Sequence, residues 1–448
     1  MNGLARGLKF QQHNGKGELL GEGEVRELLG EGGQGSVYLA RWEGREMALK
    51  WYVEPFLKSV PDHKKNLAKV IQLGAPTPKF LWPQVIVTIQ NRSEFGYLMD
   101  LRPKEYSSLN AYVSRKVRTS LRNALTACYQ LADSFRTLHL KGYAYRDISR
   151  GNAFINVSNG DVLICDNDNV VPNNSLQTGV MGTGNFIAPE ILKGNGAVPN
   201  GDSDLHSLAV LMFQILFLAH PLDGKRWANI RALDNLAQIL LYRDDPLFVF
   251  DPENDSNRPV PGLQNNPLLF WRIYPQSLKD LFIQAFTVGL RSPAHRVRES
   301  QWTGCFLEEM DHLVYCGNCG NEHFVDVPPS PPSRTYNGSC WNCNRTVSLP
   351  LSLRIDRKRI FLNRDTVLHP HHISRSQETN LDRIVAQVRR HPTDQSIWGL
   401  TNHSDRNWVI EDASSSGQSE VPPGRSVTLS PGTRIQFGTG IYGYVEAS

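Results

Sequence analysis

The chain has 448 residues, 40% of them hydrophobic and 21% charged, which is the composition of an ordinary globular protein of two to four domains. Its net charge of +4 is too small to indicate a nucleic-acid partner. The N-terminal sequence lacks the apolar run of a signal peptide, and the longest apolar stretch, residues 208–219, is too short to cross a bilayer. We therefore expect a cytoplasmic protein without a membrane partner, whose seven cysteines are reduced.

The sequence pattern changes three times along the chain. After an N-terminal extension, residues 1–20, residues 21–313 open with short β-rich segments and continue with helical patterns. Residues 314–350 hold two Cys-x-x-Cys pairs, and residues 351–448 alternate apolar and polar side chains between turn signals. We expect an α+β domain, a small cysteine-bearing ribbon and an all-β sandwich, in that order.

A glycine-rich turn stands near the start of the first domain. Gly30, Gly32 and Gly35 precede a predicted strand at residues 37–40, and Lys50 lies on the next predicted strand, after a turn at Gly44. A dinucleotide-binding fold would need a helix to begin at this loop, and a P-loop would need Gly-Lys followed by Ser or Thr. A glycine loop within a hairpin, with a lysine on the next strand, is typical of protein kinases. Taken alone, however, the pattern fits an ordinary hairpin with a surface lysine better.

A second motif decides between these interpretations. Residues 145–152 read YRDISRGN and match the kinase catalytic-loop pattern H-R-D-L-x-x-x-N in order and spacing. Residues 162–165 then form a predicted buried strand that ends at Asp166. In a kinase Asp147 would accept the proton of the substrate hydroxyl, and Asn152 and Asp166 would bind the metal ions that hold the phosphates.

Three later features follow in the same order. Residues 182–190 end in Ala-Pro-Glu, as an activation segment does, and Asp204 stands at the head of a predicted apolar helix. Arg296 is placed to pair with Glu190. The first domain therefore resembles the eukaryotic-type serine/threonine protein kinases, and we expect their bilobal α+β fold. The resemblance implies ATP and Mg²⁺ or Mn²⁺ as cofactors, with a nucleotide site formed by Gly30, Gly32, Gly35, Val37, Ala48, Lys50, Asp100, Asn152 and Asp166.

The resemblance also implies roles for the activation segment. Thr183 is expected to hydrogen-bond Asp147 rather than to carry phosphate. Arg146 beside the base suggests control by a phosphorylated activation loop, with Ser175 and Thr178 as candidate acceptors. Plain loop residues are an equally good interpretation of those two.

The sequence departs from the kinase pattern in three places. Asn66 falls where the helix after Lys50 should supply an acidic partner, and Glu54 would have to substitute from another position. The metal motif reads Asp-Asn-Asp at residues 166–168, without the usual phenylalanine and glycine. Ser149 stands where serine/threonine kinases usually carry a lysine.

These departures leave two alternatives open. One is a pseudokinase scaffold, which binds ATP without transfer and docks partners through its C-terminal regions. The other is a small-molecule kinase of related fold, against which the Ala-Pro-Glu segment and Arg296 argue. Because Lys50, Asp147, Asn152 and Asp166 are all present, we favour an active enzyme that phosphorylates serine or threonine and also itself.

The cysteine pairs predict a structural zinc site. Two Cys-x-x-Cys turns separated by twenty residues point four thiolates at one tetrahedral ion, and Gly320 suits the tight turn after the first pair. Four sulfur ligands leave no open position for catalysis. Coincidental thiols or a redox pair are the less favoured alternatives. The expected ligands are Cys316, Cys319, Cys340 and Cys343.

The C-terminal region resembles a forkhead-associated (FHA) sandwich over residues 398–404 and 421–438. In that family Asn402 would stabilise a binding loop. The residues that usually grip phosphothreonine have no clear match, and Arg364 and Ser374 are weak candidates, so a docking role is equally open. The histidines at 369, 371 and 372 are expected to lie in a polar loop rather than at a second metal.

The order of kinase, zinc ribbon and FHA-like sandwich resembles a bacterial kinase family. Its members are encoded beside a metal-dependent protein phosphatase and a von Willebrand A protein, in triads associated with tellurite resistance. This resemblance implies reversible phosphorylation of a partner in a bacterial signalling or stress-defence module.

Overall fold

The computed structural model describes residues 3–173, 175, 182–231, 234–325, 338–374, 379–411 and 418–447. The chain divides into two compact units, Met1–Arg272 with Leu278–Gly304, and Ile273–Ser277 with Cys305–Ser448. Within the described residues, no helix combines the length and the apolar character that a membrane span requires. The second unit includes part of the segment 273–313 that the sequence pattern assigns to the first domain. One reason is packing, because the rings of Tyr274 and Phe324 lie against each other at a tilt, with centroids 5.3 Å apart.

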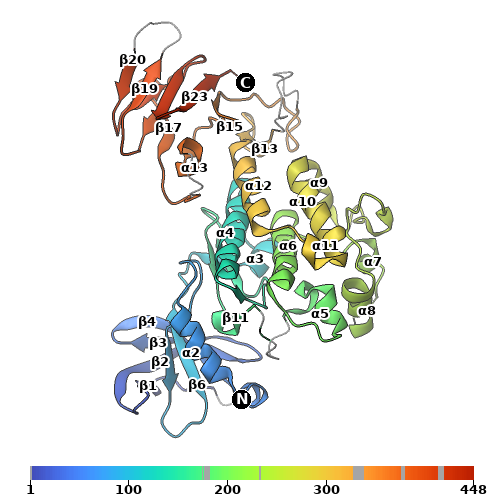
Figure 1. The fold of residues 1–448 in the computed structure, drawn as a ribbon. Coiled ribbons are helices and arrows are strands. Elements are labelled where there is room, and N and C mark those ends of the chain that lie inside the picture. The colour runs from blue at the N-terminus through green and yellow to red at the C-terminus, as the bar shows by residue number, and fades with distance from the viewer. Residues whose placement is uncertain are drawn as a thin grey trace. The chain divides into compact units, whose positions relative to one another are not determined.

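The first unit begins with a closed six-stranded barrel, in the order β1-β2-β3-β4-β6-β5, coloured blue in Figure 1. β1 (Lys9–His13) pairs antiparallel with both β2 (Leu19–Glu31) and β5 (Val85–Thr88). Its Phe10 is fully buried in the barrel core. The predicted extension of residues 1–20 therefore contributes the strand that closes the barrel.

Alternation of side chains builds the middle of this barrel. In β3 (Gly35–Trp42), Tyr38, Ala40 and Trp42 are buried, and the residues between them are more exposed. β3 pairs with β4 (Arg45–Tyr52), and β4 pairs with β6 (Phe95–Asp100). The helix α2 (His63–Leu73) packs against β5. The helix expected after Lys50, around Asn66, is thus confirmed, with Leu67 and Val70 buried.

A fully buried helix organises the rest of the first unit. Every residue of α6 (Gly201–Phe217) from Ser203 onward is buried, as expected for a helix that is apolar on all sides. It begins at Gly201, three residues before Asp204, the predicted head of the helix, because Asn200 and Ser203 form a reciprocal capping box. α4 (Leu121–Leu140) lies against it (Figure 1).

The remaining elements of the first region, in chain order, are α1 (Glu54–Ser59), β7 (Tyr106–Ser108), α3 (Leu109–Val113), β8 (Tyr143–Ala144), β9 (Ala153–Asn156), β10 (Val162–Ile164), η1 (Asn167–Asn169), β11 (Val171–Pro172), η2 (Gly184–Phe186), α5 (Pro189–Lys193), α7 (Lys225–Ala228), α8 (Asn235–Ile239), η3 (Leu240–Asp244), η4 (Asp255–Asn257), α9 (Asn265–Ile273), α10 (Gln276–Phe286), α11 (Val288–Arg291), η5 (Pro293–His295) and α12 (Glu299–Asp311).

The second unit contains a short hairpin and a sandwich. Its elements are β12 (Leu313–Tyr315), β13 (Glu322–Phe324), β14 (Ser352–Ile355), β15 (Lys358–Phe361), β16 (Val367–Leu368), α13 (Pro370–Ile373), β17 (Ala386–Arg390), β18 (Trp398–Asn402), β19 (Trp408–Glu411), β20 (Gln418–Val421), β21 (Ser426–Thr428), β22 (Arg434–Gly438) and β23 (Ile441–Glu446). One sheet has the order β15-β14-β23-β22-β19-β20 and the other β16-β17-β18-β21.

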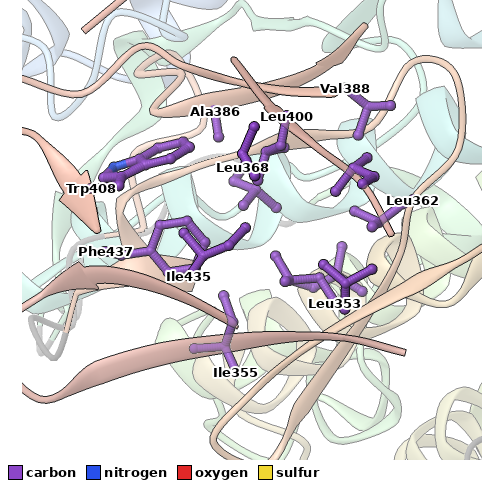
Figure 2. Close-up of a cluster of buried hydrophobic side chains, with 14 of the residues drawn as sticks. Leu353, Ile355, Leu362, Leu368, Ala386, Val388, Leu400, Trp408, Ile435 and Phe437 are labelled. Carbon is purple, nitrogen blue, oxygen red and sulfur yellow. The ribbon is translucent and has the colours of Figure 1, made fainter. Parts of the chain in front are cut away.

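The apolar faces of the two sheets form one core. Figure 2 shows Leu353, Ile355, Ile435 and Phe437 from the larger sheet on one side, and residues such as Leu400 from the smaller sheet on the other. Burial of a leucine-sized side chain contributes about 1.5–3 kcal/mol. The all-β region predicted from alternating residues is therefore a two-sheet sandwich.

The histidines at 369, 371 and 372 do not form the predicted polar loop. They occupy the short helix α13 and the residue before it, and His371 and His372 are buried. His372 Nε2 lies 3.0 Å from Asp311 Oδ1, so it is held by an acidic residue that its sequence neighbours do not reveal.

Candidate active site

The glycine-rich turn joins β2 to β3, as predicted. Gly35 begins β3 where a Cβ atom would stand 2.1 Å from the carbonyl oxygen of Trp51, so only glycine fits this strand crossing. The Gly32 amide donates to the Gly35 carbonyl across the turn at 2.8 Å. Val37 then pairs with Lys50 on β4, which places the turn and the lysine on neighbouring strands.

Lys50 is buried, with 4% of its surface exposed, and faces acidic residues. Its Nζ lies 3.0 Å and 3.1 Å from the two carboxylate oxygens of Asp168, and 3.4 Å from Asp166 Oδ1. It also donates to Gln34 Oε1, from the glycine-rich turn, at 2.9 Å. Burial lowers the pKa of Lys50, but the two aspartates outweigh it and leave that pKa raised.

Glu54 does not substitute for the missing acidic residue of α2. It is exposed and pairs with Lys58 at 2.7 Å, one helical turn along α1. The reason is local geometry, since residues four apart on a helix lie side by side on its surface. The partner of Lys50 comes instead from Asp168, in the segment after β10.

The predicted base is held by two neighbours. Thr183 Oγ1 donates to Asp147 Oδ1 at 2.8 Å, which confirms the structural role expected for Thr183. Asn152 Nδ2 donates to Asp147 Oδ2 and to the Asp147 carbonyl, both at 2.9 Å. Burial raises the pKa of Asp147, and these hydrogen bonds oppose the shift without cancelling it. A carboxylate with a raised pKa suits proton transfer.

Asp204 holds the backbone at the start of the predicted catalytic loop. Its two carboxylate oxygens accept from the backbone amides of Tyr145 at 2.6 Å and Arg146 at 2.9 Å. His139 joins the same carboxylate at 3.1 Å and contacts Glu299 on its other side. These bonds fix the backbone immediately before Asp147.

Two contacts expected of the activation segment are present, one made by Arg296 and one by Arg146. Arg296 forms a two-pronged ion pair with Glu190, both distances being 2.8 Å. Arg146 Nη2 donates to the Ser175 carbonyl at 2.6 Å, so the arginine beside Asp147 does contact this segment. Thr178, the other candidate acceptor, lies outside the described residues.

Most of the residues expected around a nucleotide lie on strands of the barrel. Ala48 is buried and Val37 packs against the same cluster, while Asp100 is exposed at the end of β6. Gly30 pairs with Val37 at the end of β2. Asp166 follows β10, with one third of its side chain exposed.

Comparison with known protein sequences identifies the family of this chain. Residues 24–284, more than half of the chain, match the family described as "Protein kinase domain". The chain belongs to this family. The kinase is similar to serine/threonine-protein kinase PknA of Mycobacterium tuberculosis, with 30% identity over 225 residues, which is 46% of this chain and 49% of that protein.

The chain is also similar to two eukaryotic protein kinases. The probable cell cycle serine/threonine-protein kinase CDC5 homolog of Encephalitozoon cuniculi is 27% identical over 46% of this chain and 44% of the relative. Mitogen-activated protein kinase kinase kinase 7 of Drosophila melanogaster is 24% identical over 45% of the chain and 29% of the relative. In all three cases the match covers less than half of the relative's length.

Sequence reasoning missed the residues behind Lys50. Asp168 accepts from the hydroxyls of Tyr52 at 2.5 Å and Tyr97 at 3.2 Å, and His63 Nε2 stands 3.6 Å away. Asp168 could have been recognised in the sequence, because an acidic residue stands there in place of the glycine of the metal motif. The two tyrosines and the histidine left none, since each reads as an ordinary residue of a strand or helix.

The four cysteines meet in the second unit. Their sulfur atoms lie within 4.8 Å of one another, with 3.6 Å between Cys316 and Cys343 and 3.5 Å between Cys319 and Cys340. A tetrahedral zinc ion with four thiolates places sulfur atoms about 3.8 Å apart. Each pair is followed by a left-handed residue that closes its turn, Gly320 with φ 73° and Asn344 with φ 57°. The cluster therefore fits zinc.

The sandwich loop after β18 is organised by Asn402. Its Nδ2 donates to the carbonyls of Arg406 and Val421, and its Oδ1 accepts from the Ser404 amide at 2.9 Å. The loop-stabilising role expected of Asn402 therefore has a geometric basis. Arg364, one of the weak phosphate candidates, stacks over the Tyr315 ring at 5.7 Å.

Proposed function

We propose that this chain is an ATP-dependent serine/threonine protein kinase. The observation that carries the proposal is the set of Lys50, Asp147, Asn152 and Asp166, complete in a chain of the kinase family and held by partly buried hydrogen bonds. Two of the relatives, PknA of Mycobacterium tuberculosis and the CDC5 homolog of Encephalitozoon cuniculi, are named as serine/threonine-protein kinases. Because the chain matches less than half of each, transfer to serine or threonine is an inference for this protein.

The residues present fit nucleotide and metal. Asn152 uses its amide nitrogen for Asp147, which leaves Oδ1, the atom that binds a hard cation. Asp166 keeps an accessible carboxylate beside Lys50. ATP supplies the transferable phosphoryl group, and Mg²⁺ neutralises its charge. Gln34 must release Lys50 when phosphates enter, because its Oε1 takes up one of the lysine's hydrogen bonds.

In the transfer itself this chain mainly positions groups. Asp147 accepts the proton of the substrate hydroxyl, in an orientation fixed by Thr183 and Asn152. Asp204 holds the loop that carries this base. Lys50 supplies positive charge to the phosphates, and the glycine-rich turn covers them with backbone amides.

The test is transfer of labelled γ-phosphate to the protein itself and to a generic basic substrate, with Mg²⁺ and then Mn²⁺. Label on serine and threonine that disappears in Asp147→Asn supports the proposal. Asp133→Asn, a partly exposed carboxylate on α4, is the matched control and should retain the label. Equal labelling of wild type and Asp147→Asn would contradict it.

A pseudokinase scaffold is the second candidate, because Ser149, Asn66 and the Asp-Asn-Asp motif depart from the kinase pattern. It predicts that a thermal shift with Mg·ATP persists while no label is transferred by the wild type. The two candidates therefore separate in the same experiment.

The C-terminal unit is proposed to hold structural zinc and to select partners. The four-cysteine geometry supports zinc, and the Asn402 loop supports an FHA-like sandwich. We further propose a cytoplasmic bacterial kinase that autophosphorylates and acts with a metal-dependent phosphatase and a von Willebrand A protein. Co-purification of the tagged chain with these two proteins tests the last point.

A further inference from the structure

We propose that Asp168 is the positioning residue for Lys50, in place of the acidic residue that α2 lacks. The inference rests on the kinase function proposed above. Kinases need their nucleotide-binding lysine paired with a carboxylate from the helix beside it. Here the carboxylate comes from the segment that also carries the metal aspartate, two residues further along.

The contact between Lys50 and Asp168 is close and excludes solvent. Lys50 Nζ lies within 3.1 Å of both Asp168 oxygens, and the side chains are 5% and 0% exposed. Tyr52 and Tyr97 donate to the same carboxylate, one hydroxyl to each oxygen. A buried ammonium is costly unless it is paired and hydrogen-bonded, and Asp168 meets both conditions.

Asp166 alone does not provide a sufficient counterion for Lys50. It lies farther from Lys50, at 3.4 Å, and its side chain is one third exposed, which leaves it accessible to a cation. A divalent cation on Asp166 would take over much of its negative charge. Asp168 lies behind the lysine without solvent exposure, so it stays available as the dedicated counterion. The two aspartates thus divide the roles of metal ligand and lysine anchor.

The neighbouring contacts hold Asp168 in place. Asn167 Nδ2 donates to the carbonyls of Leu81 at 2.8 Å and Ile164 at 3.0 Å, which pins the turn from which Asp168 projects. His63, the first residue of α2, approaches the same carboxylate and packs edge-on against the Tyr52 ring, with centroids 4.5 Å apart. The helix therefore reaches the lysine through His63 and Asp168 rather than through its own carboxylate.

The first experiment measures affinity without turnover. Binding of fluorescent N-methylanthraniloyl-ADP with Mg²⁺ should weaken about 10- to 100-fold in Asp168→Asn, the effect of losing a charge-assisted hydrogen bond. In a separate turnover assay, the KM for protein substrate should stay unchanged, which separates a role at Lys50 from a general structural loss. Nucleotide affinity equal to wild type would overturn the proposal.

Two controls test the assignment to Asp168. Asp161→Asn removes another carboxylate of the same unit, which pairs with Lys79 away from Lys50, and should lower stability without changing nucleotide affinity. Glu54→Gln should change neither property, because Glu54 pairs with Lys58. A loss of affinity in Glu54→Gln that matches the loss in Asp168→Asn would contradict the assignment.

The second experiment is a rescue that moves the carboxylate to α2. Asp168→Gly alone should lose affinity, and the double variant Asp168→Gly with His63→Glu should recover most of it, because His63 already faces the lysine's partner. This pair decides the question if Asp168→Asn fails to fold. No recovery in a folded double variant would overturn the proposal. Because binding is measured without transfer, a wild type that binds nucleotide but transfers no phosphate would refute only the kinase function.

Discussion

The guanidinium of Arg296 and the carboxylate of Glu190 lie in a two-pronged ion pair, joining residues 106 positions apart. Arg296 has only 2% of its side chain exposed and also donates to the Asp202 carbonyl. The end of the activation segment is therefore tied to the core of the first unit. This pair gives the first prediction.

Replacement of Glu190 by glutamine should lower the free energy of unfolding by about 3 kcal/mol, because it leaves a buried guanidinium without its counter-charge. Urea denaturation measures the change. Asp245→Asn removes the partner of Arg226 in a pair whose carboxylate is 70% exposed, and should cost less than about 1 kcal/mol. Equal effects of the two substitutions would contradict this account.

Thr183→Val should move the acidic limb of the pH–rate profile to higher pH. The Thr183 hydroxyl hydrogen-bonds Asp147 and lowers its pKa, which burial has raised. Without that bond the pKa rises further, so the base becomes protonated at a higher pH and activity is lost earlier on acidification. The profile of kcat/KM against pH measures the shift, and Thr183→Ser should restore the wild-type limb.

The His139 cluster should make folding sensitive to alkaline pH. Burial opposes protonation of His139, but Asp204 and Glu299 outweigh it and raise its pKa to about 9. The resulting stability is fully present below about pH 6.5 and is lost as the pH rises through about 9, with an upper limit of about 3 kcal/mol. The free energy of unfolding at pH 6 and pH 10 tests this against His139→Gln, which should lack that part of the decline.

Removal of zinc should unfold the cysteine-bearing part of the second unit. Metal analysis is expected to find one zinc per chain, and Cys340→Ser should lose the ion along with the local structure, because the metal supplies folding energy there. Cys305→Ser alters a thiol outside the cluster and should keep the ion. Retention of one zinc per chain by Cys340→Ser would argue against the four-cysteine site.

Much of the kinase unit could be predicted because its signals are local. The lysine strand, the catalytic loop and the strand before Asp166 each follow from a short pattern of side chains at fixed spacing. The hydrogen bond between Thr183 and Asp147 was expected from the resemblance to kinases, and the structure confirms it. The four cysteines of the two Cys-x-x-Cys pairs likewise lie in one cluster, as their spacing predicts.

The tertiary structure alone decided which charge meets Lys50. Sequence proximity favoured Glu54, four residues away, whereas the partner is Asp168, 118 residues away. A buried charge is paired by whichever elements pack around it, and packing is a property of the folded chain. The same reason explains why β1 closes the barrel and why His372 finds Asp311. The sequence by itself determined the local elements and the order of motifs, and long-range packing determined how the buried charges are satisfied.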